Sequence, residues 1–372
     1  MRIFNHGGNL RKAAENYNIS AERIIDFSSN INPLGIPPEI KKIAIKDIDN
    51  ILGGACRYPD PECKLLKDVL SASLGVKTSN LLIGNGSNEL IYLLVRVLAP
   101  ARVLIPVPSF SEYERAAVSA GAECRFLSFK MGHGSSSEFN LKVDKVLQNI
   151  DGVNLIFICN PNNPTGLLLH KDEIEYLIRK CEERNVFVII DEAFIDFVEG
   201  SEDAAMIGAA IKNKNVAVLR SMTKFFAIAG LRLGYLVGNS KLVKKISENQ
   251  PTWSVNYLAQ LVGKELIKNY DFTRKSKEYI LEQRAIFFKS LEKIDWLEPY
   301  ETAANFILCE IKDSKITADE LNRHCLEKEK MLIRDCSNFR GLDDYFFRVA
   351  VKKHNENKKL IHCLANIDKD KF

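Results

Sequence analysis

The strongest constraint on the fold is a rhythm of short apolar runs that alternate with longer segments of helical spacing. The runs are rich in β-branched residues and lack polar alternation, so they predict strands that are buried on both faces. Helical segments such as 89–98, 111–120 and 171–184 separate them. This rhythm predicts βαβ units and a mostly parallel sheet with helices on both faces. The predicted strands are 81–83, 103–105, 125–129, 155–159, 186–190, 216–219 and 234–237.

The pattern changes after about Asp271, where a long charged helical segment precedes shorter strand-like runs. A chain of 372 residues is long enough for a large domain and a smaller one. The expected organisation is an N-terminal segment over residues 1–40 that packs on the small domain, a large α/β domain over 41–270, and a small α+β domain over 271–372.

Composition excludes several classes of protein. The chain has 52 Lys+Arg against 48 Asp+Glu and no long basic block, so it does not favour nucleic-acid binding. No apolar run approaches the roughly 18 residues of a membrane span, and the N-terminus carries no signal-like stretch. The nine cysteines include no C-x-x-C pair and no zinc spacing, so no metal site is expected. We expect a reduced, cytoplasmic, soluble protein.

Two polar motifs follow successive predicted strands. Asp191 ends the run 186–190, where ligands bind in open α/β sheets, although an Asp there can also simply cap the next helix. Ser221, Lys224 and Arg232 follow the next strand. A serine and an arginine suit a phosphate. A desolvated lysine beside another cation has a lowered pKa and can form a Schiff base.

Two further loops lie at strand ends. Asn163 stands in the rigid run Asn-Pro-Asn-Asn-Pro-Thr-Gly at 160–166 and offers an amide, unless the run is only a turn. Gly86 opens a predicted helix after a strand, where free backbone N–H groups hold a phosphate well. A short Gly-x-Gly alone is equally typical of a tight turn.

Together these loops supply an amine, a carboxylate, an amide and a phosphate cradle. In this order they resemble the fold-type I pyridoxal-phosphate enzymes of the aminotransferase class I/II family, over nearly the whole chain. The resemblance implies an α/β fold with a mostly parallel sheet of about seven strands and a smaller α+β domain. It also implies pyridoxal 5′-phosphate as the cofactor and a homodimer with shared active sites.

The resemblance assigns a role to each residue that matches a family motif. Lys224 corresponds to the lysine that forms the Schiff base, and Asp191 to the carboxylate that keeps the pyridine nitrogen protonated. Asn163 matches the donor to the ring hydroxyl, and Phe110 the aromatic residue that stacks on the ring. The residues that match the cradle for the cofactor phosphate are Gly86, Ser87, Asn88, Ser221 and Arg232, together with Tyr58 from the neighbouring subunit.

The same resemblance points to a set of substrate residues. Arg348 matches the clamp on the substrate α-carboxylate, and Arg334 suits a substrate phosphate, as does His6. Asn32 and Asn163 complete the set. Each of three assignments has a competing structural interpretation: Phe110 could be an ordinary core residue, Tyr58 a surface turn residue and Arg348 a solvated residue at a strand end.

Two activities of the family fit a phosphorylated amino compound. One is decarboxylation of L-threonine O-3-phosphate for cobalamin biosynthesis, and the other is amino transfer between histidinol phosphate and 2-oxoglutarate. The runs 6–9, 26–35 and 219–235 are similar to the decarboxylase, and Phe194 stands where the aminotransferase has a tyrosine. The sequence therefore predicts a carbon–carbon lyase, with the aminotransferase as the alternative. A ligand-sensing transcription regulator is disfavoured, because residues 26–35 already belong to the catalytic pattern.

Overall fold

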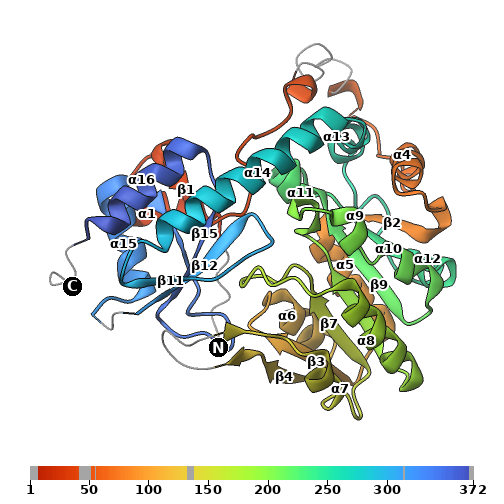
Figure 1. Cartoon of the computed structure of the whole chain (residues 1–372). Helices are drawn as coiled ribbons and strands as arrows, with labels where there is room; N and C mark the ends of the chain where they lie inside the picture. Colours follow the sequence, from red (N-terminus) through yellow and green to blue (C-terminus); the bar gives the residue numbers. More distant parts are fainter. Residues whose placement is uncertain (1–6, 42–51, 55, 132–137, 313–314, 368–372) are drawn as a thin grey trace.

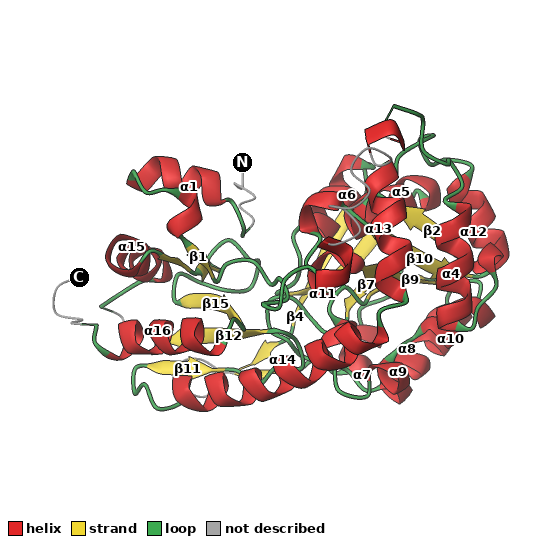
Figure 2. Cartoon of the chain, turned by 90° about the horizontal axis from the view of Figure 1, so that it is seen from above, coloured by secondary structure: helices red, strands yellow, loops and turns green. Residues whose placement is uncertain are grey.

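The computed structural model describes residues 7–41, 52–54, 56–131, 138–312 and 315–367 (Figure 1). Its framework consists of a seven-stranded sheet and a four-stranded sheet. Helix α14 (Tyr270–Leu291) extends along both halves of the molecule (Figure 2). The cavity described below lies between these two sheets.

The seven-stranded sheet is mostly parallel, as the sequence predicts. Every neighbouring pair is parallel except the two pairs made by one strand, β10 (Gly234–Gly238), which runs antiparallel to both of its neighbours. The strand order is β2–β10–β9–β8–β7–β3–β4. The other bounds are β2 (Leu81–Gly84), β3 (Arg102–Val107), β4 (Glu123–Ser128), β7 (Leu155–Cys159), β8 (Phe187–Asp191) and β9 (Val216–Ser221).

Both faces of this sheet are buried except at its edge strand β4, which explains the absence of polar alternation in the other six strands. Along β8, Val188 and Ile190 belong to one apolar cluster, whereas Ile189 between them belongs to the cluster on the opposite face. Successive side chains of a strand point to opposite faces, so each strand contributes to two cores. The helices of this part are α4 (Lys64–Leu74), α5 (Gly86–Leu98), α6 (Glu112–Ser119), α7 (Val143–Leu147), α8 (Lys171–Glu183), α9 (Ser201–Ala204), α10 (Ile207–Lys212), α11 (Met222–Phe225), α12 (Ser240–Ser247) and α13 (Tyr257–Ile267).

The four-stranded sheet is antiparallel and has the order β11–β12–β15–β14. Helices α14 and α16 lie beside it (Figures 1 and 2). The elements of this part are β11 (Leu297–Pro299), β12 (Phe306–Ile311), α15 (Ala318–Glu329), β13 (Met331–Leu332), β14 (Arg334–Asp335), β15 (Phe346–Ala350) and α16 (His354–Ala365).

The N-terminal segment is attached to the C-terminal part of the chain. After α1 (Leu10–Tyr17), strand β1 (Ile25–Asp26) pairs in parallel with β13. Ile40, further along, joins the core of the seven-stranded sheet instead. The domain boundaries at residues 40 and 270 stay a prediction. The remaining elements are the hairpin of β5 (Lys130–Met131) and β6 (Glu138–Phe139) and the 3₁₀ turns η1 (Ala21–Arg23), η2 (Thr78–Asn80), η4 (Ile195–Phe197) and η5 (Ala229–Leu231).

Candidate active site

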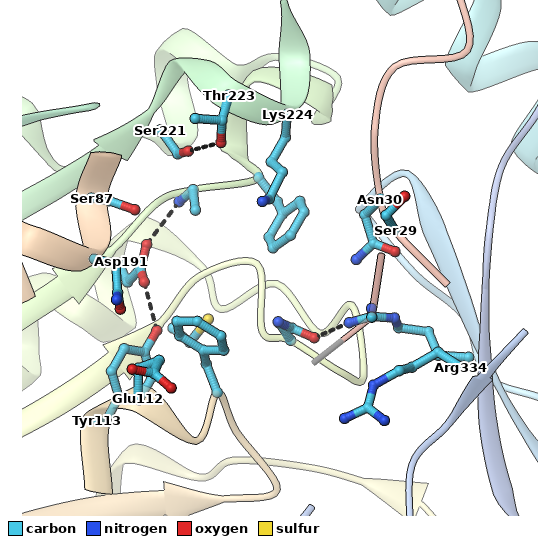
Figure 3. A pocket seen from close by; sticks show the side chains of 18 of the residues that line it. Ser29, Asn30, Ser87, Glu112, Tyr113, Asp191, Ser221, Thr223, Lys224 and Arg334 are labelled. Atoms are coloured by element: carbon cyan, nitrogen blue, oxygen red, sulfur yellow. Dashed lines mark hydrogen bonds between the residues drawn. The ribbon is translucent and has the colours of Figure 1, made fainter. Parts of the chain in front are cut away.

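A cavity of about 370 Å³ lies at the carboxyl ends of the parallel strands, between the two sheets. That volume is within the range of small-molecule sites. In Figure 3, Asp191, Ser87 and Tyr113 lie on one side of the amine of Lys224, and Ser29, Asn30 and Arg334 lie on the other. Residues from both halves of the molecule therefore face the same space.

The topology of the sheet brings the cradle residues together. Strands β2, β8 and β9 point the same way, so the segments after Gly84, Asp191 and Ser221 emerge at one edge. Because β10 is antiparallel, its amino end lies at this edge too, and Gly234 pairs with both Gly84 and Ser221. Arg232, two residues before Gly234, therefore reaches the same corner as the amino terminus of α5.

This corner has the properties of a phosphate site. Gly86 has φ +77°, and a Cβ there would stand 2.6 Å from Nη2 of Arg232. Only glycine therefore lets the guanidinium approach the first turn of α5, where backbone N–H groups are free for an anion. The Ser221 and Thr223 hydroxyls are 2.7 Å apart. The amide oxygen of Asn88 is buried without a hydrogen-bond partner.

Asp191 lies at the floor of the cavity and is held by two donors. The Tyr113 hydroxyl donates to Oδ2 at 2.7 Å, and the Ala193 backbone N–H donates to Oδ1 at 3.0 Å. Tyr113 is itself fixed, because its ring stacks on Phe157 at 4.5 Å. Burial raises the pKa of Asp191, although both hydrogen bonds oppose this shift. A buried carboxylate of this kind is suited to a cationic partner.

Lys224 supplies an amine that is easily deprotonated. Burial, together with the positive charges of Arg232 and Arg348, lowers its pKa to about 8, whereas Asp191 acts in the opposite direction. At neutral pH a useful fraction of this amine is therefore uncharged and nucleophilic.

Two arginines form the opposite wall. Arg334 and Arg348 are direct cross-strand partners on β14 and β15, and both are buried, at 8% and 5% exposure. Like charges in this position repel each other. Burial, with a smaller contribution from the charge of Arg334, lowers the pKa of Arg348 to about 10. An anionic ligand would offset both the repulsion between the two arginines and the unfavourable burial of their charges.

The two guanidinium groups are oriented by their neighbours. Arg348 donates to Oδ1 of Asn163 and, at 3.1 Å, to the Ser28 carbonyl, while its Nε is buried without a partner. Arg334 donates from Nη2 to Oδ1 of Asn338 at 2.7 Å and from Nη1 to the Asp335 carbonyl at 2.5 Å.

The structure gathers most of the residues that the sequence singles out. Gly86 lies immediately behind the cradle, and His6 falls outside the described residues. Tyr58 does not face this cavity in the single chain. It is 77% exposed and stacks on Trp253 at 4.2 Å. The predicted residues that line the cavity are Ser87, Asn88, Phe110, Asn163, Asp191, Ser221, Lys224, Arg232, Arg334 and Arg348.

Asn32 requires a correction. Its amide donates to the Phe225 carbonyl at 2.8 Å and to the Ser276 hydroxyl at 2.9 Å, and its oxygen accepts from the Leu34 N–H at 3.0 Å. With its hydrogen-bonding groups engaged in the scaffold, it is not among the residues that line the cavity. Asn30 lines the cavity instead, and its buried amide oxygen has no hydrogen-bond partner.

Several lining residues escaped the sequence reasoning. Tyr113 stands in the same motif as Phe110, and Thr223 in the same motif as Lys224. Their polar side chains beside these predicted site residues could have identified them from the sequence. Residues 28–30 stand inside the run 26–35, which the sequence marks only as a family pattern, and their place beside β15 results from the pairing of β1 with β13. The lining residues that the sequence reasoning missed are Gly7, Ser28, Ser29, Asn30, Glu112, Tyr113, Arg115, Cys159, Ala193, Thr223 and Phe339. Phe194 also lines the cavity and entered the sequence analysis only as a difference from the aminotransferase.

The site fits pyridoxal phosphate. The glycine-dependent corner suits its phosphate, Asp191 its ring nitrogen, and the lowered pKa of Lys224 its aldehyde. The fold and the site together define a pyridoxal-phosphate enzyme of fold type I. The sequence profile of the family "Aminotransferase class I and II" matches residues 22–364, and the chain belongs to that family.

Three comparisons illustrate the relationship. A protein of Caldanaerobacter subterraneus subsp. tengcongensis, provisionally assigned as a threonine-phosphate decarboxylase, is 39% identical over 99% of this chain and 95% of its own length. The threonine-phosphate decarboxylase of Salmonella typhimurium is 36% identical over 99% of this chain and 98% of its own. The crystal structure of the histidinol-phosphate aminotransferase of Clostridium acetobutylicum is 32% identical, with a TM-score of 0.83 over 93% of this chain and 99% of its own.

None of the helices in the described ranges is both long and apolar enough to cross a bilayer. The same ranges hold no group of three or more His, Cys, Asp or Glu side chains placed to bind a metal ion.

Proposed function

We propose that this enzyme decarboxylates L-threonine O-3-phosphate, giving (R)-1-aminopropan-2-yl phosphate and CO₂, as a step of cobalamin biosynthesis. The full-length similarity to threonine-phosphate decarboxylases supports this reaction. The structural feature that carries the proposal is the pair of buried arginines, Arg334 and Arg348, in cross-strand register on the wall opposite Asp191. The substrate bears two anionic groups, a carboxylate and a phosphate, and so matches the two guanidinium groups.

Each residue acts through the group that it presents. Pyridoxal phosphate, when bound, supplies an electron sink for the bond that breaks at the substrate α-carbon. Asp191, fixed by Tyr113, contributes the negative charge that keeps the pyridine nitrogen protonated. Lys224 supplies the neutral amine that holds the cofactor. The cradle of Ser87, Ser221 and Arg232 binds its phosphate.

The substrate residues set the orientation. Arg348 binds the α-carboxylate, and Arg334 binds the substrate phosphate. The Asn163 oxygen accepts from Arg348, which leaves its amide N–H groups for the ring oxygen of the cofactor. Phe194 has no hydroxyl with which to share that task. By holding the substrate at its carboxylate and its phosphate, Arg348 and Arg334 would set its orientation toward the cofactor, and that orientation would decide between loss of CO₂ and loss of the α-proton.

Amino transfer between histidinol phosphate and 2-oxoglutarate is the second candidate. The similarity to the Clostridium acetobutylicum aminotransferase favours it, since that likeness also covers nearly the whole chain. The identity is lower than that to the two decarboxylases. Histidinol phosphate carries no carboxylate for Arg348, which would then serve only the second substrate, 2-oxoglutarate. We therefore place it second.

The two activities differ in their need for a keto acid. We expect the cofactor-loaded enzyme to release CO₂ from L-threonine O-3-phosphate alone, measured by CO₂ capture together with product analysis. Turnover that requires 2-oxoglutarate and yields glutamate would establish the aminotransferase instead. Arg348→Gln should lower kcat/KM for decarboxylation by about a hundredfold, because it leaves the substrate carboxylate unpaired. Arg323→Ala, which breaks an exposed pair with Asp319 on α15, is the matched control.

We also propose a homodimer in the cytoplasm, in which Tyr58 reaches the cofactor phosphate of the neighbouring subunit. Large apolar side chains are exposed around Tyr58, which supports an interface there: Leu52 is 58% exposed, Leu65 67% and Trp253 46%. All nine cysteines are free thiols, which is typical of a reducing compartment.

A further inference from the structure

The loop that joins β14 to β15 reaches from the small sheet to the large one. Arg340 in this loop pairs with Glu114 of α6, with Nη2 2.7 Å from Oε1 and Nε 3.4 Å from Oε2. Its guanidinium also lies 3.8 Å from the ring centroid of Phe126 on β4. A two-point ion pair over an aromatic face fixes both the position and the plane of an arginine. Arg340 therefore joins the two halves of the molecule beside the cavity.

A second contact anchors the same loop. The Lys130 amine on β5 lies 3.8 Å from a carboxylate oxygen of Asp343 and 3.8 Å from one of Glu310, and 4.2 Å from the ring centroid of Phe346. Asp343 is 58% exposed at its side chain, so this contact is the weaker of the two.

Short connections run from the Arg340 anchor to both ends of the cavity. Towards the substrate end, Asn338 accepts from Arg334, and the Phe339 ring lies 5.3 Å from the same guanidinium. Towards the cofactor end, Glu114 follows Tyr113, whose hydroxyl holds Asp191. The anchor thus lies between the group that binds the substrate and the carboxylate that faces the cofactor.

We propose that Arg340 and Glu114 are positioning residues. They set the separation between the arginines of β14 and β15, Arg334 and Arg348, and the cofactor end of the cavity. This inference rests on the proposed function, because it concerns a substrate held at both of its anionic ends. Neither residue touches the substrate. Their effect is geometric: a displacement of about 1 Å in a bound substrate can cost roughly a hundredfold in rate.

The test compares variants of the cofactor-loaded enzyme. We expect Arg340→Ala to lower kcat/KM for L-threonine O-3-phosphate by about ten- to a hundredfold, with much of the loss in kcat. Glu114→Ala should give a similar loss, and the double variant should be no worse than either, because the two residues act through one contact. Arg340→Lys, which keeps the charge but loses the two-point pair and the planar stacking, should recover only part of the activity. Arg323→Ala is again the control.

Two measurements separate positioning from a general loss of structure. The thermal midpoint of each variant should stay within about 3 °C of the control, since the pair is partly exposed. Amide hydrogen exchange of residues 336–344 should become faster, and the affinity for inorganic phosphate, as a probe of Arg334, should fall. If Arg340→Ala unfolds, Arg340→Lys and Glu114→Gln take its place in the same comparison.

The results discriminate among the possibilities. A kcat/KM within twofold of wild type, or losses that multiply in the double variant, would overturn the proposal. If the wild-type enzyme releases no CO₂ from the substrate, the proposed function fails, and amide exchange and phosphate affinity still test the anchor. If the amide exchange of residues 336–344 and the phosphate affinity are both unchanged in Arg340→Ala, the positioning role of Arg340 is rejected independently of the proposed function.

Discussion

At the scale of single residues, the chemistry depends on how Lys224 is surrounded. Burial, Arg232 and Arg348 all disfavour its charged form, whereas the negative charge of Asp191 favours it. The amine therefore becomes neutral about two pH units below the value of a solvated lysine. Because its buried surroundings disfavour the charged form, Lys224 offers the cofactor a neutral amine.

This environment predicts a pH dependence. After removal of the cofactor, the rate at which added pyridoxal phosphate changes the visible absorbance should rise with pH, with a midpoint at about 8. The folded pKa is below the unfolded one, so the stability of the apoprotein should also rise with pH as it passes through and above that midpoint. Arg348→Met removes one positive neighbour and should move the midpoint upward. A midpoint at the value of a free lysine, or no shift in Arg348→Met, would contradict this account.

At the scale of the elements, a buried ion pair joins the ends of β8 and β9. Arg220 donates from Nε to Glu192 at 2.7 Å and from Nη1 to Asp196 at 2.9 Å. Glu192 also accepts from the Met206 N–H at 2.7 Å. Burial lowers the pKa of Arg220, but the two carboxylates more than offset this effect, and the pKa ends above its ordinary value. Glu192 follows Asp191 and Arg220 precedes Ser221, so the pair fixes the strand ends that carry the site.

Breaking this pair should be costly. Glu192→Ala leaves Arg220 buried without its main partner, and we expect a loss of about 3–5 kcal/mol in the free energy of unfolding. Urea unfolding measures it. Glu182→Ala, which removes a solvent-exposed contact to Lys214 at 3.9 Å, should cost less than about 1 kcal/mol. The double replacement Glu192→Leu with Arg220→Met should recover most of the stability. A loss below about 1 kcal/mol in Glu192→Ala would refute the stabilising role of the Glu192–Arg220 pair.

At the scale of the whole molecule, the exposed stack of Tyr58 on Trp253 predicts that the site is completed by a second copy of the chain. If Tyr58 serves the neighbouring subunit, a mixture of the inactive variants Lys224→Ala and Tyr58→Ala should regain activity. In a mixed dimer one site has both lesions and the other has none, so random exchange should restore about a quarter of the wild-type rate. No recovery after verified subunit exchange would contradict a role for Tyr58 in the site of the neighbouring subunit.

Much of this protein is determined by its sequence alone. The inner strands of the large sheet are marked by apolar runs without polar alternation, since a strand covered on both faces needs no polar side. The edge strand β4 (Glu123–Ser128) has no buried residue and carries polar side chains. The motifs around Asp191, Lys224 and Arg232 are local as well, because each stands directly after a strand or before one. Their order along the chain therefore predicts both the fold and the cofactor.

Other features were decided only by the tertiary structure. Asn32 and Asn30 are equally polar in the sequence, but packing directs the first to Phe225 and Ser276 and leaves the second beside the cavity. The cross-strand register of Arg334 and Arg348, and the contact of Arg340 with Glu114, join residues from distant parts of the chain or on separate strands. Local patterns specify which elements form. The pairing of β1 with β13 and the contact of the β14–β15 loop with α6 are long-range contacts. Only the folded chain therefore fixes which side chains meet in the site.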